Sequence, residues 1–127
     1  MTTRFTAIVI SAGVLIALAA ATAEASQSAT RIGHCVETRV KEVGTRLEGA
    51  PGSGSLVTFA NGGVQVSYDQ VPEVDQSRPG DRVSMCVVSI PKDCPAGDDR
   101  GRTYKTTNKR TGQSWTLPDS EHGCGGA

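Results

Sequence analysis

The sequence contains few aromatic residues: two Phe, two Tyr and one Trp among 127 residues, or 4% of the chain. A hydrophobic core of this chain must therefore be built mainly from Val, Leu and Ile. Internal repeats and a long helical pattern are absent as well. Their absence argues against solenoids and helical bundles, which need one or the other.

The chain also lacks an excess of charge of either sign. Its 13 Lys and Arg residues are balanced by 13 Asp and Glu residues, which gives a formal net charge of +0. A protein that binds nucleic acid in general carries a strong positive excess, because it must neutralise phosphates. Nucleic acid is therefore not an expected partner.

One long apolar run is present, and it lies at the N-terminus. Arg4 precedes an almost unbroken apolar stretch over 5–20, and small residues with two overlapping A-x-A sites follow at 21–25. This order of charge, apolar run and small residues is typical of a secretory signal peptide. We expect cleavage after Ala25, with Ala23 as the alternative. A permanent anchor is disfavoured, because the run is shorter than the ~20 apolar residues that span a bilayer.

The sequence thus predicts three parts. Residues 1–25 form a signal helix, 26–33 a loose polar lead-in, and 34–127 a single small domain. The expected location is the periplasm or the medium, and no membrane span is expected after cleavage.

Four cysteines follow the predicted signal peptide: Cys35, Cys86, Cys94 and Cys124. Their even number, the short chain and export to an oxidising compartment predict two disulfides. Each would stabilise the domain by ~2–4 kcal/mol. Three pairings are possible, and two of them stay open ahead of the third: 35–86 with 94–124, or 86–94 with 35–124.

The clearest local signal is a hairpin. Two β-prone runs at 55–60 and 64–69 flank Asn61-Gly62-Gly63, and Asn-Gly between such runs favours a tight turn. A strand is also predicted over 35–47, with a bulge near Gly44 where the apolar parity shifts. A helix is the alternative there, since the same apolar residues fit a 3.6 period.

The remaining strands are shorter. The run 82–90 is apolar on both parities and predicts a central strand, and 102–107 and 113–117 predict two more. A link broken by Pro72 joins the hairpin to them. The expected fold is all-β: a small barrel or sandwich of five to six short antiparallel strands, of the oligonucleotide/oligosaccharide-binding (OB-like) or SH3-like kind.

A basic segment is the main candidate for ligand binding. Five cations lie within eleven residues without an acid among them, with one aromatic inside the run and another close behind: Arg100, Arg102, Tyr104, Lys105, Lys109, Arg110 and Trp115. Cations and an aromatic ring on one face of a hairpin would suit an anionic glycan, a lipid headgroup or an acidic protein. The alternative is a solvated strand face, or ion pairs with Asp98 and Asp99.

Other chemistries have weaker signals. His34 and His122 each lie near a cysteine, but oxidised cysteines are not metal ligands, so neither a metal site nor a cofactor is expected. The run 119–122 holds a hydroxyl, carboxylates and an imidazole, which leaves a small envelope hydrolase as one alternative, although no nucleophile elbow is recognisable. The loop 91–101 would be the finger of a secreted hydrolase inhibitor, a second alternative.

Five motifs in the second half carry a resemblance: Gly-Asp-Arg-Val at 80–83, Ser-Ile-Pro-Lys-Asp-Cys-Pro-Ala-Gly-Asp-Asp-Arg-Gly at 89–101, Thr-Asn-Lys-Arg-Thr at 107–111, Ser-Trp-Thr-Leu-Pro-Asp-Ser at 114–120 and His-Gly-Cys-Gly-Gly at 122–126. They resemble a family of small, exported, uncharacterised alphaproteobacterial proteins. The resemblance implies export and a cysteine framework, and it transfers no functional residues. Our leading hypothesis is an exported, non-enzymatic binding or structural module of the cell envelope.

Overall fold

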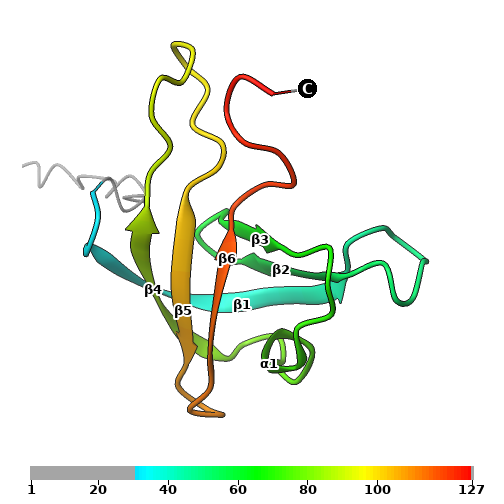
Figure 1. The fold of residues 1–127 in the computed structure, drawn as a ribbon. Helices are drawn as coiled ribbons and strands as arrows, with labels where there is room; N and C mark the ends of the chain where they lie inside the picture. The colour runs from blue at the N-terminus through cyan, green and yellow to red at the C-terminus, as the bar shows by residue number, and fades with distance from the viewer. Residues whose placement is uncertain (1–30, 127) are drawn as a thin grey trace, which may run out of the picture.

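The structure, a computed structural model, describes residues 31–126 (Figure 1). The predicted signal peptide and most of the lead-in lie outside the described residues. Within them the chain forms six strands and one short helix: β1 (Cys35–Thr45), β2 (Ser55–Phe59), β3 (Val64–Val66), α1 (Pro72–Asp75), β4 (Arg82–Ser89), β5 (Thr103–Asn108) and β6 (Ser114–Pro118). No helix in this part of the chain is long and apolar enough to cross a membrane.

The six strands form one antiparallel sheet in the order β3-β2-β1-β4-β5-β6. The sheet curls into a half-barrel, in which β1, β2 and β3 run behind and across β4, β5 and β6 (Figure 1). The predicted small all-β fold of short antiparallel strands is confirmed. The curl brings the edge strands β3 and β6 close together without making them hydrogen-bonded neighbours in the sheet.

The first strand belongs to both halves of the sheet. It pairs with β4 up to Arg39 and with β2 from Val40 onward. One extra residue, Lys41, lies between the pair Val40–Phe59 and the next pair, and this bulge lets the strand bend. The predicted bulge in this strand is therefore confirmed, but it lies at Lys41 and not near Gly44, because the bend falls where β1 changes partners and Gly44 is regularly paired with β2. The helical alternative for this segment is wrong.

The predicted hairpin between β2 and β3 is confirmed, with shorter strands than expected. Gly62 takes a φ of 85°, which a side chain would strain, and the amide of Gly63 donates to the side-chain oxygen of Asn61 at 2.9 Å. After the hairpin, the expected link becomes the single-turn helix α1. Pro72 begins this helix, where a missing N–H has no cost.

The core lies between the two halves of the sheet. Val supplies most of it, and the other members are Met85, Phe59, Tyr104 and Trp115; its valines are Val40, Val57, Val74, Val83 and Val87. Three of the four described aromatic residues are therefore inside. Leu and Ile contribute only at its margin, through Leu117 and Ile90.

Both predicted disulfides are present, and no cysteine among the described residues is free. Cys35 is bonded to Cys86, which joins the directly paired positions of β1 and β4. Cys94 is bonded to Cys124, which joins the β4–β5 loop to the C-terminal tail. The structure thus selects one of the two open pairings. Two disulfides in so small a domain are typical of an oxidising, extracytoplasmic environment.

A single polar side chain connects the edge strands across the core. Gln65 of β3 is fully buried, and its Nε2 donates to the carbonyls of Tyr104 and Leu117, each at 3.0 Å. Its Oε1 accepts from the hydroxyl of Thr106 at 2.7 Å and from the indole N–H of Trp115 at 2.9 Å. All donors and acceptors of the amide are satisfied, as a buried amide requires.

We expect Gln65→Leu to lower the free energy of unfolding by about 3 kcal/mol, because it leaves the indole N–H and the Thr106 hydroxyl unpaired in the core. Urea denaturation of the purified domain measures this change. Gln70→Leu replaces an exposed glutamine and is the matched control, expected within about 0.5 kcal/mol of the parent. Equal stability of the two variants would contradict the bridging role of Gln65.

Candidate functional site

A cavity of about 280 Å³ lies at one open end of the half-barrel. It is formed where the β2–β3 turn faces the segments that precede β5 and follow β6. Its apolar lining comes from Val36, Val64, Met85 and Tyr104, and its polar lining from Asn61, Asp99, Arg102 and Asp119. An apolar lining with a few converging polar groups is the usual composition of a small-molecule site.

Arg102 is the only cation that the described part of the chain contributes to the lining of this cavity. It is placed just before β5, where its carbonyl accepts from the amide of Asp119 at 2.9 Å and extends the β5–β6 ladder by one pair. The Oδ1 atom of Asp119 in turn accepts from the amide of Gly101 at 2.7 Å. These backbone contacts fix the direction in which Arg102 leaves the sheet.

The guanidinium of Arg102 is only loosely partnered, although its side chain is 20% exposed. The nearest acid is Asp99, whose Oδ1 lies 4.0 Å from Nη2, beyond hydrogen-bond distance, and whose side chain is 82% exposed. Among residues 31–126, no protein group accepts a hydrogen bond from this guanidinium. Its five N–H donors are thus left to water or to a ligand.

The predicted site residues are distributed over several regions. Arg102 and Tyr104 meet at the cavity. Tyr104 and Trp115 are buried on the inner face of the sheet, whereas Lys105 is exposed and has no ion pair within the described part of the chain. The rings of Tyr104 and Trp115 therefore do not lie on the exposed face that carries Lys105. A role of Lys105 in binding stays a prediction.

Two other cations of the basic segment are held by acids. Arg100 donates to both carboxylate oxygens of Asp98 at 2.9 Å and, from Nη2, to the carbonyl of Gly126 at 3.2 Å. The Nζ of Lys109 lies 2.6 Å from Oε2 of Glu37 on β1. Both cations lower the pKa of the acid that they contact, mainly through these hydrogen bonds.

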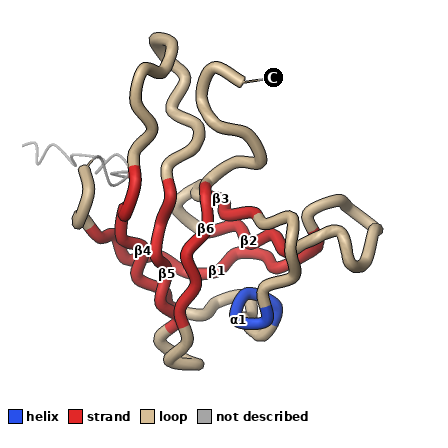
Figure 2. Tube along the Cα trace, viewed as in Figure 1, coloured by secondary structure: helices blue, strands red, loops and turns tan. Residues whose placement is uncertain are grey.

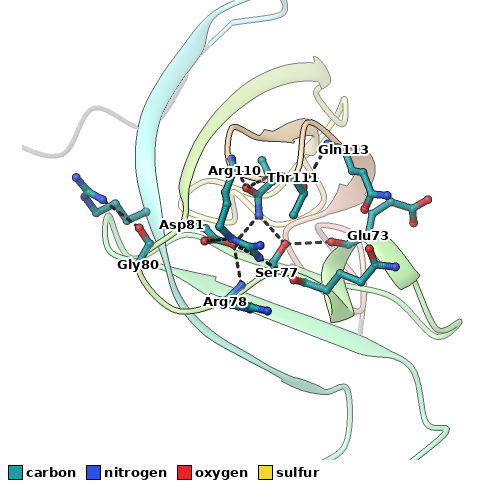
Figure 3. Close-up of polar contacts among 11 residues, drawn as sticks. Glu73, Ser77, Arg78, Gly80, Asp81, Arg110, Thr111 and Gln113 are labelled. Atoms are coloured by element: carbon teal, nitrogen blue, oxygen red, sulfur yellow. Dashed lines mark hydrogen bonds and ion pairs between the residues drawn. The ribbon is translucent and has the colours of Figure 1, made fainter.

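Arg110 is part of a polar cluster at the other end of the half-barrel (Figure 3). Its Nε and Nη2 donate to the two carboxylate oxygens of the buried Asp81 at 2.6 and 3.0 Å. The same carboxylate accepts from the amide of Arg78 and the side chain of Asn108, each at 2.8 Å. The hydrogen bonds from Arg110 are the main reason that the pKa of Asp81 lies well below its usual range.

The rest of this cluster ties the turn after α1 to the β5–β6 turn. Asn108 is fully buried and donates to the hydroxyl of Ser77 at 2.9 Å, while its Oδ1 accepts from the amide of Arg110 at 2.9 Å. Ser77 donates to the carbonyl of Glu73 at 3.0 Å. These contacts could not be predicted from the sequence, because Asn108 at the end of β5 is 27 residues from Asp81 and 31 residues from Ser77 along the chain.

The C-terminal tail shows no catalytic arrangement among the described residues. The hydroxyl of Ser120 donates to the backbone carbonyl of His122 and not to its imidazole. Glu121 forms an ion pair with Arg46 at 3.2 Å. No group of three or more His, Cys, Asp or Glu side chains within residues 31–126 is arranged to hold a metal ion.

The β4–β5 loop and the tail extend together beyond the strands (Figure 2). The Cys94–Cys124 disulfide joins them, and the carboxylate of Asp98 accepts from the amide of Gly125 at 2.9 Å. The expectation that this loop acts as an inhibitor finger stays a prediction.

Neither protein-family models, nor curated protein sequences, nor solved structures give a match to this chain. The resemblance of its second half to small exported proteins therefore stays a prediction, and function has to be argued from the geometry alone.

The lowered pKa of Asp81 predicts acid sensitivity. In the unfolded chain Asp81 titrates near 3.8, whereas the folded protein holds its pKa below that value. The stabilisation of the folded state by this lowered pKa is present above about pH 4. It is lost as the pH falls further, because the unfolded chain then binds the extra proton. We expect Asp81→Asn to melt at a lower temperature at pH 7 and to lose less stability than the parent between about pH 5 and pH 2.

Thermal melting followed by circular dichroism over this pH range measures the effect. The control is Asp69→Asn, because Asp69 is exposed and its carboxylate has no partner among the described residues. Parallel stability–pH curves for the parent and Asp81→Asn would contradict the assignment.

Proposed function

We propose that this protein is a non-enzymatic binding module of the periplasm or the medium, and that its ligand site is the cavity beside Arg102. The observation that carries the proposal is the guanidinium of Arg102, which donates no hydrogen bond to any group within residues 31–126 and lies at a cavity lined by both apolar and polar side chains. Such a group is costly to enclose without a partner, so its position favours recognition of an anion.

The chemistry of the cavity defines the ligand class. Met85 and Tyr104 supply an apolar floor, while Arg102 supplies the positive charge. The ligand expected from these groups is a small amphipathic anion. Of the partner classes considered above, a lipid headgroup with the first part of its acyl chain combines both properties, whereas a glycan or an acidic peptide offers little apolar surface.

Two carboxylates lie in the same lining and restrict the anion. Asp119 is engaged with the amide of Gly101, and Asp99 extends into solvent. A singly charged headgroup with hydroxyl or amine donors therefore fits better than a multiply charged one, because its donors meet these acids while its charge meets Arg102.

The two disulfides support a location outside the cytoplasm, since such bonds persist in oxidising compartments. The non-enzymatic part of the proposal is supported by the tail, where Ser120 and Glu121 serve in structural contacts. A binding module needs only a preformed site, and the cavity is bounded by strands that the core and a disulfide hold in place.

Binding of lauroyl lysophosphatidylglycerol below its micelle concentration tests the proposal, because its headgroup carries one negative charge and two hydroxyl donors; neutral dodecyl maltoside is the uncharged probe. We expect Arg102→Ala to weaken lysophosphatidylglycerol binding by about tenfold or more, because a charged hydrogen-bond partner is lost. Isothermal titration calorimetry measures the affinity. Lys105→Ala is the matched control, since it removes an exposed cation from the same strand region but not from the cavity.

Equal weakening by the two variants would show that the anion senses only the general surface charge. Unchanged affinity in Arg102→Ala, or equal affinity for the neutral probe, would overturn the proposed site.

A further inference from the structure

A second hollow lies on the seam between the two edge strands. Its volume is about 270 Å³, and it is lined by residues that end β3 and follow it, and by residues that end β6 and follow it. Its lining includes Val66, Tyr68, Asp69, Leu117, Ser120 and Glu121. Pockets for drug-sized ligands usually measure ~300–1,000 Å³, so this groove suits one ring-sized unit of a larger molecule.

Tyr68 gives the groove its distinctive character. It is 56% exposed, whereas the other described aromatic residues, Phe59, Tyr104 and Trp115, are buried. Burying an aromatic side chain is strongly favourable, and this core has few of them. The exposure of Tyr68 therefore indicates that its ring has a role other than packing in the core.

The ring is held in place rather than left loose. The guanidinium carbon of Arg46 lies 4.3 Å from the ring centroid. Arg46 is itself fixed, since its Nε donates to the carbonyl of Ser53 at 2.7 Å and its Nη1 to Glu121 at 3.2 Å. Its side chain is only 17% exposed. A cation packed over an aromatic ring stabilises both groups, so the ring is oriented before any ligand arrives.

The backbone beside Tyr68 is fixed as well. The amide of Ser67 donates to the carbonyl of Ser55 at 2.9 Å, and the amide of Asp69 donates to the hydroxyl of Ser67 at 3.0 Å. Gly54 lies against this segment so closely that an added Cβ would fall 1.9 Å from the carbonyl oxygen of Ser67. Only glycine permits that approach.

The polar groups of the groove are mainly acceptors. Asp69 has no side-chain partner among the described residues, and Glu121 uses one oxygen for Arg46. No cation belongs to the lining that residues 31–126 supply, and the adjacent Arg46 is already engaged with Ser53 and Glu121. These carboxylates repel an anionic ligand and accept hydrogen bonds from hydroxyl groups. A ligand that combines an apolar ring face with many hydroxyl donors matches both features.

We propose that the Tyr68 groove binds a neutral glycan, one pyranose ring of which stacks on Tyr68 while its hydroxyls donate to Asp69 and Glu121. Leu117 and Val66 form the apolar base beside the ring. This site is independent of the cavity at Arg102, because the two share no lining residue.

The test uses the full domain and neutral tetrasaccharides of glucose and of N-acetylglucosamine, with polygalacturonate as the anionic counterpart. We expect at least one neutral tetrasaccharide to shift the backbone amide resonances of residues 66–69 and 117–121, with a dissociation constant below about 10 mM. Polygalacturonate is expected to leave these resonances in place. Absence of any shift with the neutral sugars at this concentration overturns the proposal.

Variants then separate stacking from general folding effects. Tyr68→Ala should weaken the sugar affinity by about tenfold or more, whereas Tyr68→Phe keeps the ring and should stay within about threefold of the parent. Asp69→Ala removes an acceptor whose side chain holds nothing else, so it should weaken binding severalfold without lowering the melting temperature.

Arg102→Ala serves as the control for the other cavity and should leave sugar binding unchanged. Loss of sugar binding in Arg102→Ala, or full binding in both Tyr68→Ala and Asp69→Ala, would place the sugar elsewhere. If only the Arg102 proposal fails, the results expected for sugar binding at the Tyr68 groove stay the same.

Discussion

The architecture depends on the buried amide of Gln65. The sheet curls until its edge strands approach, and this amide links β3 to both β5 and β6 through four hydrogen bonds. A slip of β3 by one residue would turn Gln65 outward and place an apolar side chain opposite the polar groups of Thr106 and Trp115. The link therefore fixes both the closure of the half-barrel and the register of its shortest strand.

Both candidate sites flank this link. Val64, the residue before Gln65, lines the cavity of Arg102, and Val66, the residue after it, lines the groove of Tyr68. The carbonyls that accept from Gln65 belong to Tyr104 of the cavity and Leu117 of the groove. The buried amide of Gln65 thus lies between the two hollows and contacts residues that line each of them.

The extent to which sequence predicts this structure follows from how local each signal is. The β2–β3 hairpin was predictable because Asn61 and Gly62 encode the turn by themselves, and the disulfides because cysteines in an exported chain have few other roles. The Gln65 bridge was not, since alternation between two valines places a glutamine on the solvent face. The position of the bulge at Lys41 depends on the change of strand partner within β1, and this change is a property of the tertiary structure. The cations of the basic segment looked like one surface, yet their acidic partners, such as Asp81 and Glu37, lie far away in the chain.

The positive and negative charges of this chain therefore balance within individual ion pairs as well as over the whole sequence. Arg110, Arg100 and Lys109 each meet an acid, and the pKa of each of these acids is lowered by its partner. The exposed pairs of Arg100 and Lys109 each add little stability, whereas the pair of Arg110 includes the buried Asp81. All three pairs reduce the unpaired positive charge of the surface. Arg102 differs because its nearest acid stays beyond hydrogen-bond distance. The Tyr68 groove differs because its described lining holds carboxylates and no cation, while Arg46 packs over the Tyr68 ring. The two proposed sites thus differ in character: the cavity of Arg102 offers donors to an anion, and the groove of Tyr68 offers acceptors to hydroxyl groups.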